Sequence, residues 1–147
     1  MTYSEVIKTL ENIANDSIFI KDFVSGRLSD INDIFTKGTK EFPKMWVTPQ
    51  NTTINKNSVV YSLEVDILDI CTDASNANVY AEKVISDCTA IFNDVVTKLE
   101  FNLTTNEAYT ESPITLTPYF EKPSEYVAGV TGTINIIVDR NNAFCKA

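Results

Sequence analysis

The chain has 147 residues, and none of them is histidine. Histidine is the commonest general base and metal ligand near neutral pH, so its absence excludes Ser-His and Cys-His nucleophile pairs. Glycine is also scarce, and none of Gly26, Gly38, Gly129 and Gly132 lies in a spacing that cradles phosphate or binds a dinucleotide. The sequence therefore predicts a protein that is not an enzyme and that needs no cofactor.

Long hydrophobic runs and paired cysteines are missing as well. No apolar run approaches the roughly 20 residues that a membrane-spanning helix needs, and charged Glu5 and Lys8 stand where a signal peptide is apolar. Cys71, Cys88 and Cys145 are far apart and fit no metal-ligand spacing, which argues against a disulfide framework or a zinc site. We expect a protein made in the cytoplasm with reduced thiols, Cys88 among them as a core thiol, and with no membrane partner.

Basic residues are few and scattered. The chain has 12 Lys and Arg against 20 Asp and Glu, which gives a net charge of −8. Binding to the phosphate backbone depends on clustered cations, so this composition argues against a surface that grips nucleic acid. An acidic surface can still lie beside DNA where its task is to let DNA slide past without adhesion.

Hydrophobic periodicity predicts a short helix at the N-terminal end of the chain, a long strand near its middle and a long helix after that strand. Thr2 and Glu5 form a capping-box pattern ahead of a helix over residues 3–14. A period of two from Val59 to Ile67 predicts a long strand over residues 58–71, and apolar steps of three or four over residues 77–99 predict a long helix. Trp46, Tyr61 and Phe92 coincide with apolar positions, as does Tyr119, so we interpret them as core residues and not as a platform for stacking bases.

Shorter patterns complete the predicted fold. Residues 42–49 have a strand composition bracketed by prolines, which is typical of an edge strand. Residues 18–24 form a strand or a buried turn, residues 28–40 a connection with at most a short strand, and residues 114–120 and 134–138 two closing strands. The order predicts a single α+β domain over residues 1–147, with a mainly antiparallel sheet packed by the long helix and the short N-terminal helix.

Two polar connections are long enough to project from this domain. The first is Asn-rich and covers residues 50–57, as a hairpin loop or an arm, and the second covers residues 121–132. Such connections usually carry function, so we expect both to contact neighbouring chains, and we expect deletion of either to leave the fold intact. Residues 141–147 form a tail that is ordered only where something holds it. The candidate contact residues are Gln50, Asn51, Asn55, Glu121, Pro123 and Tyr126.

Carboxylates are concentrated along the long strand and just after it, at Glu64, Asp66, Asp69 and Asp73. Carboxylates two residues apart share a strand face and are able to hold Mg²⁺, so a metal-dependent nuclease is one alternative. A sheet with one buried face normally turns a polar face to water, and we interpret these residues as an exposed acidic surface without metal. Glu64, Asp66 and Asp69 are then candidates for the lining of a DNA passage, and lysine at positions 64 and 66 should barely change stability.

The order and the residue composition of these segments resemble those of a known protein family. The segments "FVSGRLSDI", "FPKMWVTPQ", "VVYSLEVDILDI" and "TDASNANVYAEKVISDCTAIFNDVVTKL", followed by a closing strand pair, resemble the tail-terminator and neck (head–tail connector) proteins of tailed bacteriophages over about residues 3–139. The resemblance implies a non-enzymatic virion protein that forms a homomeric ring of six or twelve subunits. It also implies portal, neck or tail proteins as partners and DNA passing through the centre. An acidic protein-binding module, such as a DNA-mimic inhibitor, is the alternative.

Overall fold

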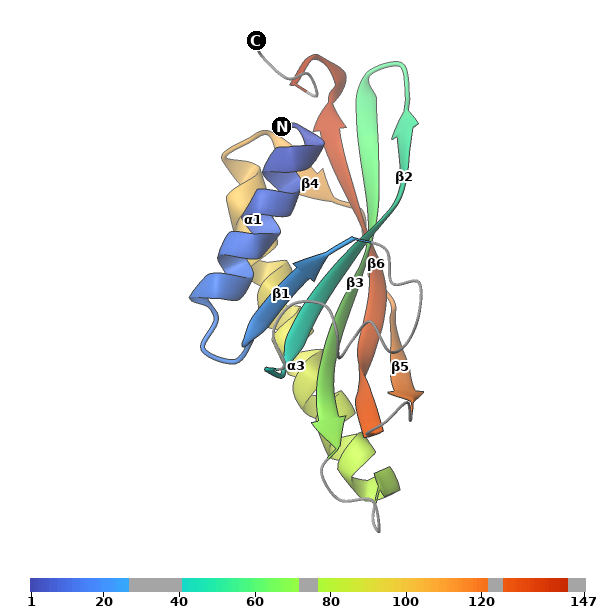
Figure 1. Cartoon of the computed structure of the whole chain (residues 1–147). Coiled ribbons are helices and arrows are strands. Elements are labelled where there is room, and N and C mark those ends of the chain that lie inside the picture. The colour runs from blue at the N-terminus through green and yellow to red at the C-terminus, as the bar shows by residue number, and fades with distance from the viewer. Residues whose placement is uncertain (27–40, 72–76, 122–125, 143–147) are drawn as a thin grey trace.

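The part of the chain that the structure describes forms one six-stranded sheet with two helices (Figure 1). The computed structural model describes residues 1–26, 41–71, 77–121 and 126–142. The elements are α1 (Tyr3–Asp16), β1 (Asp22–Ser25), β2 (Lys44–Ile54), β3 (Ser58–Cys71), α3 (Ala77–Thr104), β4 (Ala108–Thr110), β5 (Leu116–Glu121), β6 (Tyr126–Asp139) and a short 3-10 turn, η2 (Arg140–Asn142).

The sheet has the strand order β1-β2-β3-β6-β4, and β5 pairs with a second stretch of the same edge of β6. β1 runs parallel to β2, and the other pairs are antiparallel. This arrangement confirms the predicted α+β class, with a mainly antiparallel sheet packed by helices. The predicted long strand over residues 58–71 is also confirmed, with the same bounds.

Both helices lie against the same face of the sheet, and the main core fills the space between (Figure 1). α1 begins at the predicted capping box, in which Thr2 Oγ1 accepts the Glu5 N–H at 3.3 Å and Glu5 Oε2 accepts the Thr2 N–H at 2.6 Å. Alternate residues of the two central strands, paired as Leu63 with Ile134, point toward the helices because side chains alternate along a strand. The buried helix residues of this core are Val6, Leu10, Ile13, Ala14, Cys88, Phe92, Val95, Leu99 and Leu103.

A second, smaller cluster lies on the other face of the sheet. Its buried members are Trp46, Leu68 and Val127, and the half-buried Tyr119 packs against it. The indole Nε1–H of Trp46 donates to the Gly26 carbonyl at 3.0 Å. Trp46 and Tyr119 are therefore core residues, as predicted, but of this second cluster.

The first part of β2 is an interior strand, so its prediction as an edge strand is wrong. β1 pairs in parallel with residues 44–47, and β3 pairs on the other side. Residues on both faces of this stretch are consequently buried, including the Lys44 side chain, whose Nζ lies 3.2 Å from the Asp22 carboxylate. Beyond Val47, β3 is the one described strand that pairs with β2.

The predicted projecting loop over residues 121–132 is also wrong, because β5 ends at Glu121 and β6 already begins at Tyr126. Pro123 lies outside the described residues, as do Asp73 and residues 27–40. The two glycines of this segment lie inside β6, where a Cβ on Gly129 would clash with the Ile67 carbonyl oxygen, so only glycine fits this close approach. Deleting this segment would remove three buried strand residues, Val127, Ala128 and Val130, from three different hydrophobic clusters.

In the described ranges, neither helix combines the length and apolarity that a membrane crossing requires.

Candidate functional site

The three acidic residues singled out in the sequence do not form one surface. Glu64 and Asp66 lie on the face of β3 that points away from the helices. Asp69 is an odd number of residues further along, so its side chain lies on the helix side, where it lines a groove against α3. Within the described parts of the chain, no three Cys, Asp or Glu side chains gather closely enough to hold a metal ion.

Asp66 is buried, so its interpretation as an exposed carboxylate is wrong. It is 5% exposed and is paired in register with Trp46 on β2 and Thr131 on β6. Burial raises the pKa of Asp66 to about 6; the negative charge of Glu64 adds to this rise, and the hydrogen bond with the Thr131 side chain opposes it. On the face of the sheet away from the helices, the small cluster around Trp46 makes the surroundings of Asp66 apolar. The alternating pattern of the sequence does not indicate this cluster.

A groove of about 480 Å³ with a mainly apolar lining lies between α3 and the turn that joins α1 to β1. We call it the α3 groove. Cys88 at its base is fully buried, whereas Ile18 and Phe19 at its side are 76% and 54% exposed. The apolar lining comprises Ile18, Phe19, Pro43, Cys88, Ala90 and Ile91.

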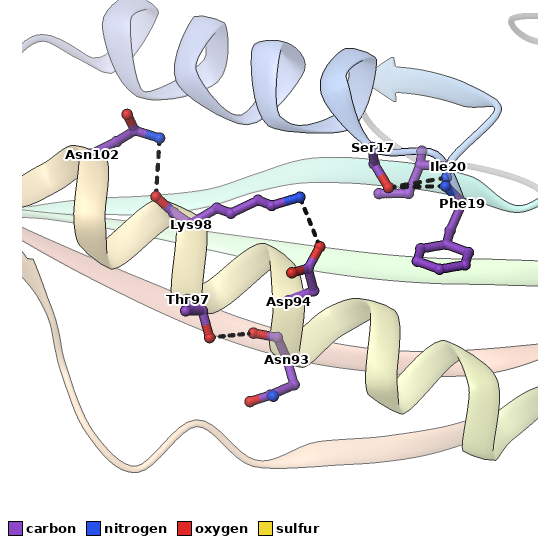
Figure 2. Close-up of polar contacts among 8 residues, drawn as sticks. All are labelled: Ser17, Phe19, Ile20, Asn93, Asp94, Thr97, Lys98 and Asn102. Atoms are coloured by element: carbon purple, nitrogen blue, oxygen red, sulfur yellow. Dashed lines mark hydrogen bonds and ion pairs between the residues drawn. The ribbon is translucent and has the colours of Figure 1, made fainter.

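The turn that carries the exposed apolar pair is held by its own hydrogen bonds. Ser17 Oγ accepts the N–H groups of Phe19 and Ile20 at 3.2 and 3.3 Å, as Figure 2 shows. The Lys21 ammonium donates to the Ile18 carbonyl at 3.0 Å. The turn is therefore a defined structure that keeps two large apolar side chains in contact with solvent.

Acidic side chains surround this apolar surface. Asp69 from β3 and Asp87 and Asp94 from α3 line the groove, and Lys21 is the one cation among the described residues of this lining. Asp94 pairs with Lys98 at 2.9 Å one turn along α3 (Figure 2). Burial raises the pKa of Asp69, and the charge of Asp87 adds to this rise, while the hydrogen bond from the Ile70 N–H opposes it. The groove thus has an apolar base and a negative border.

The β2–β3 hairpin is the second candidate surface, and it contains the predicted arm over residues 50–57. Gln50 lies at an irregularity in the ladder between Pro49 and Asn51, and the strands then pair up to Ile54 and Val59. All residues from 50 to 57 are exposed, so the predicted arm is an extended ribbon with a short turn and not a loose loop. We call residues 54–57 the hairpin tip.

The hairpin tip presents an apolar side chain beside cations. Ile54 is 68% exposed, and Lys56 next to it is also exposed. Asn55 closes the turn by donating its N–H to the Ser58 carbonyl at 2.8 Å. Arg140, at the end of β6, donates its backbone N–H to the Asn57 carbonyl at 3.1 Å, and its guanidinium to the Lys56 carbonyl at 3.5 Å. The tip is therefore braced by the third strand.

Sequence reasoning identified the arm but missed the groove. The signal for the groove was present in Ile18 and Phe19, two large apolar residues that follow the end of α1 and belong to no apolar face of a helix or strand. In the sequence, Asp87 and Asp94 fall among the polar positions of the long helix. That pattern gives no indication that Asp69 of β3 lines the same groove.

Comparisons with known proteins do not identify the chain. No protein-family model matches it, and no curated protein matches it significantly.

Proposed function

We propose that this chain is a non-enzymatic structural subunit of a homo-oligomeric ring in the neck or tail of a tailed bacteriophage. In this role the ring joins head or portal to tail and surrounds the path of the DNA, which it does not bind in a sequence-specific way. Closed symmetric assembly is the default for repeated structural subunits, and six or twelve copies are the numbers that the family resemblance implies.

The observation that carries the proposal is the β2–β3 hairpin. Its exposed ribbon occupies the end of the sheet away from β1, and β6 supports it along β3 as far as the pairing of Ser58 with Asp139 (Figure 1). A ribbon that is ordered, exposed on every residue from 50 to 57 and ended by an apolar side chain is suited to contact a neighbouring chain. The α+β fold agrees with the fold that the resemblance implies.

The charge of the chain supports the same role. At −8 the subunit repels phosphate, and a ring of such subunits multiplies that charge around its axis. This contribution comes from the whole surface. Asp66 is buried and Asp69 faces α3, so neither residue is a candidate for the lining of the passage. Glu64, which is half-buried, is the remaining candidate of the three.

Electron microscopy tests the proposal directly. Images of the purified protein, or of a particle that contains it, should show a closed ring coaxial with the tail or neck. A subunit that is present in the particle as single, separate copies would contradict the proposal. Monomers of the isolated protein would not, because a ring can form solely on the template of its neighbours. A monomer or dimer that inhibits a nucleic-acid enzyme would favour the acidic binding module instead.

A further inference from the structure

We propose that the hairpin tip of one subunit docks into the α3 groove of the next copy of this chain. The contact is heterologous, because it joins two different surfaces, and it is repeated from copy to copy. This inference rests on the ring proposed above and names the contact that would build it.

The two surfaces match in chemistry. The tip presents the exposed apolar side chain of Ile54, and the groove has an apolar base next to the exposed Ile18 and Phe19. Burial of these side chains against one another would remove from water the apolar surface that both leave exposed in the single chain.

The charges match as well. Lys56 in the tip and Arg140 beside it are exposed and outnumber the neighbouring Asp139, while Asp69, Asp87 and Asp94 line the groove. Lys98 pairs with Asp94, and Lys21 in the lining donates to the Ile18 carbonyl. Among the described residues no cation pairs with Asp87, so the border of the groove keeps negative charge that a basic partner would neutralise. Complementary charge of this kind selects the partner and its orientation.

The tip cannot reach the groove of its own chain. The tip lies at the end of the sheet near the N terminus, where the Tyr61 hydroxyl donates to the Met1 carbonyl. The groove is lined by Ile18 and Phe19 of the α1–β1 turn, and this turn lies at the opposite end of α1 from the N terminus (Figure 1). With 14 residues, α1 is about 21 Å long. The pairing of β3 with β6 and the bonds from Arg140 hold the tip in place. The occupant is therefore a second copy.

Each copy has one tip and one groove, at different ends of the domain. A head-to-tail contact of this kind extends from copy to copy and produces a closed ring when the rotation between neighbours divides a full turn. Because the tip is already ordered, docking requires little further loss of conformational freedom.

The test uses the full chain and two single variants, each with a neighbouring control. Ile54→Asp places a charge in the apolar contact at the tip, and Thr53→Asp places the same charge on the other face of the ribbon. Ala90→Arg fills the groove from an exposed helical position, and Thr89→Arg adds the same side chain one residue away, outside the lining. Circular dichroism verifies that all four variants are folded.

Sedimentation velocity measures assembly at protein concentrations from about 1 μM to about 1 mM. This range detects association with a binding free energy as small as about 4 kcal/mol. The wild type and both controls should associate alike. Ile54→Asp and Ala90→Arg should each weaken association at least about tenfold. An equimolar mixture of these two retains one intact tip and one intact groove, so it should form a heterodimer and stop there.

Three results would overturn the docking: variants that assemble like the wild type, a mixture without heterodimer, or a wild type that stays monomeric throughout the range. In the first case a ring seen in micrographs still supports the proposed function and only the contact is wrong. In the last case micrographs of the particle decide the function separately.

Discussion

Replacing Asp66 with asparagine should stabilise the protein at neutral pH. The carboxyl is buried beside Trp46, and the half-buried Glu64 adds a like charge two residues away. Asparagine has the same shape, and its side-chain oxygen can still accept the hydrogen bond that Thr131 makes with the carboxylate. The substitution therefore removes a charge and little else.

The size of the effect follows from the pKa. In the folded chain the pKa of Asp66 is raised by burial from 3.8 to about 6. At about 1.4 kcal/mol for each pKa unit, this difference corresponds to about 3 kcal/mol by which folding disfavours the charged form. For a domain of this size such a gain would raise the melting temperature by about 6–12 °C.

The sign of the pH dependence is also fixed. Between pH 3.8 and about pH 6 the folded chain holds a proton on Asp66 that the unfolded chain has released. The free energy of unfolding from this group is therefore highest below pH 3.8 and falls as pH rises through about 6. An asparagine side chain cannot titrate, so the Asp66→Asn variant should match the wild type in acid and exceed it at pH 8.

Urea unfolding at a series of pH values measures this difference. Glu82→Gln, at an exposed position of α3, removes one negative charge without burial and should give a nearly constant difference of less than about 0.5 kcal/mol. The compared quantity is the free energy of unfolding of Asp66→Asn minus that of the wild type. If this difference is no larger at pH 8 than at pH 4, the argument from burial is refuted.

Three other substitutions test separate parts of the fold by urea unfolding. Gly129→Ala brings a Cβ against the Ile67 carbonyl oxygen and should cost about 3 kcal/mol, and a loss below about 1 kcal/mol would mean that β6 can shift there. Lys44→Met leaves the Asp22 carboxylate buried without its cation and should cost about 3–5 kcal/mol; adding Asp22→Asn should recover most of this, and no recovery would contradict the role of the pair. Thr2→Ala removes the cap of α1 and should cost about 1 kcal/mol, whereas an unchanged midpoint would show that the cap contributes nothing.

The sequence predicts best those elements whose apolar residues recur with a single period and are buried in a single hydrophobic core. Residues 59, 61, 63, 65 and 67 form a period of two because the helix side of this stretch of β3 is apolar, and the predicted strand has the observed bounds. The start of α1 was predictable from the capping box at Thr2 and Glu5, because both of its hydrogen bonds join residues within one helical turn. The end of the long helix was placed early, at residue 99, and the helix continues to Thr104.

The predictions that the structure contradicts concern residues whose environment depends on contacts between distant segments of the chain. Gly129 and Gly132 fall in the segment that was predicted as a loop, but they lie in β6. They are glycine there because Ile67 approaches Gly129 closely and Leu116 and Phe92 approach Gly132. Asp66 alternates with apolar residues as an exposed side chain would, but it is buried beside Trp46, its register partner on β2. Lysine at position 66 would therefore destabilise the protein strongly, contrary to the expectation from the sequence.

The candidate surfaces divide in the same way. The arm over residues 50–57 was recognisable from its polar composition between two strands, although β2 extends through most of it. The α3 groove combines residues from the α1–β1 turn, β3 and α3, and their proximity follows from the fold alone. β4, with three residues, was too short to give any periodic signal.

The pairing of β3 with β6 has a consequence for how the chain folds. The two strands are joined over their whole length, from Ser58 with Asp139 to Cys71 with Tyr126, although α3 and two further strands separate them in the sequence. Contacts of such long sequence separation form slowly, because a large loop must close first. During synthesis the β2–β3 hairpin is complete early, while the other edge of β3 stays open until the last strand arrives. Loss of the final strand would thus expose the centre of the sheet, where edge-to-edge aggregation begins.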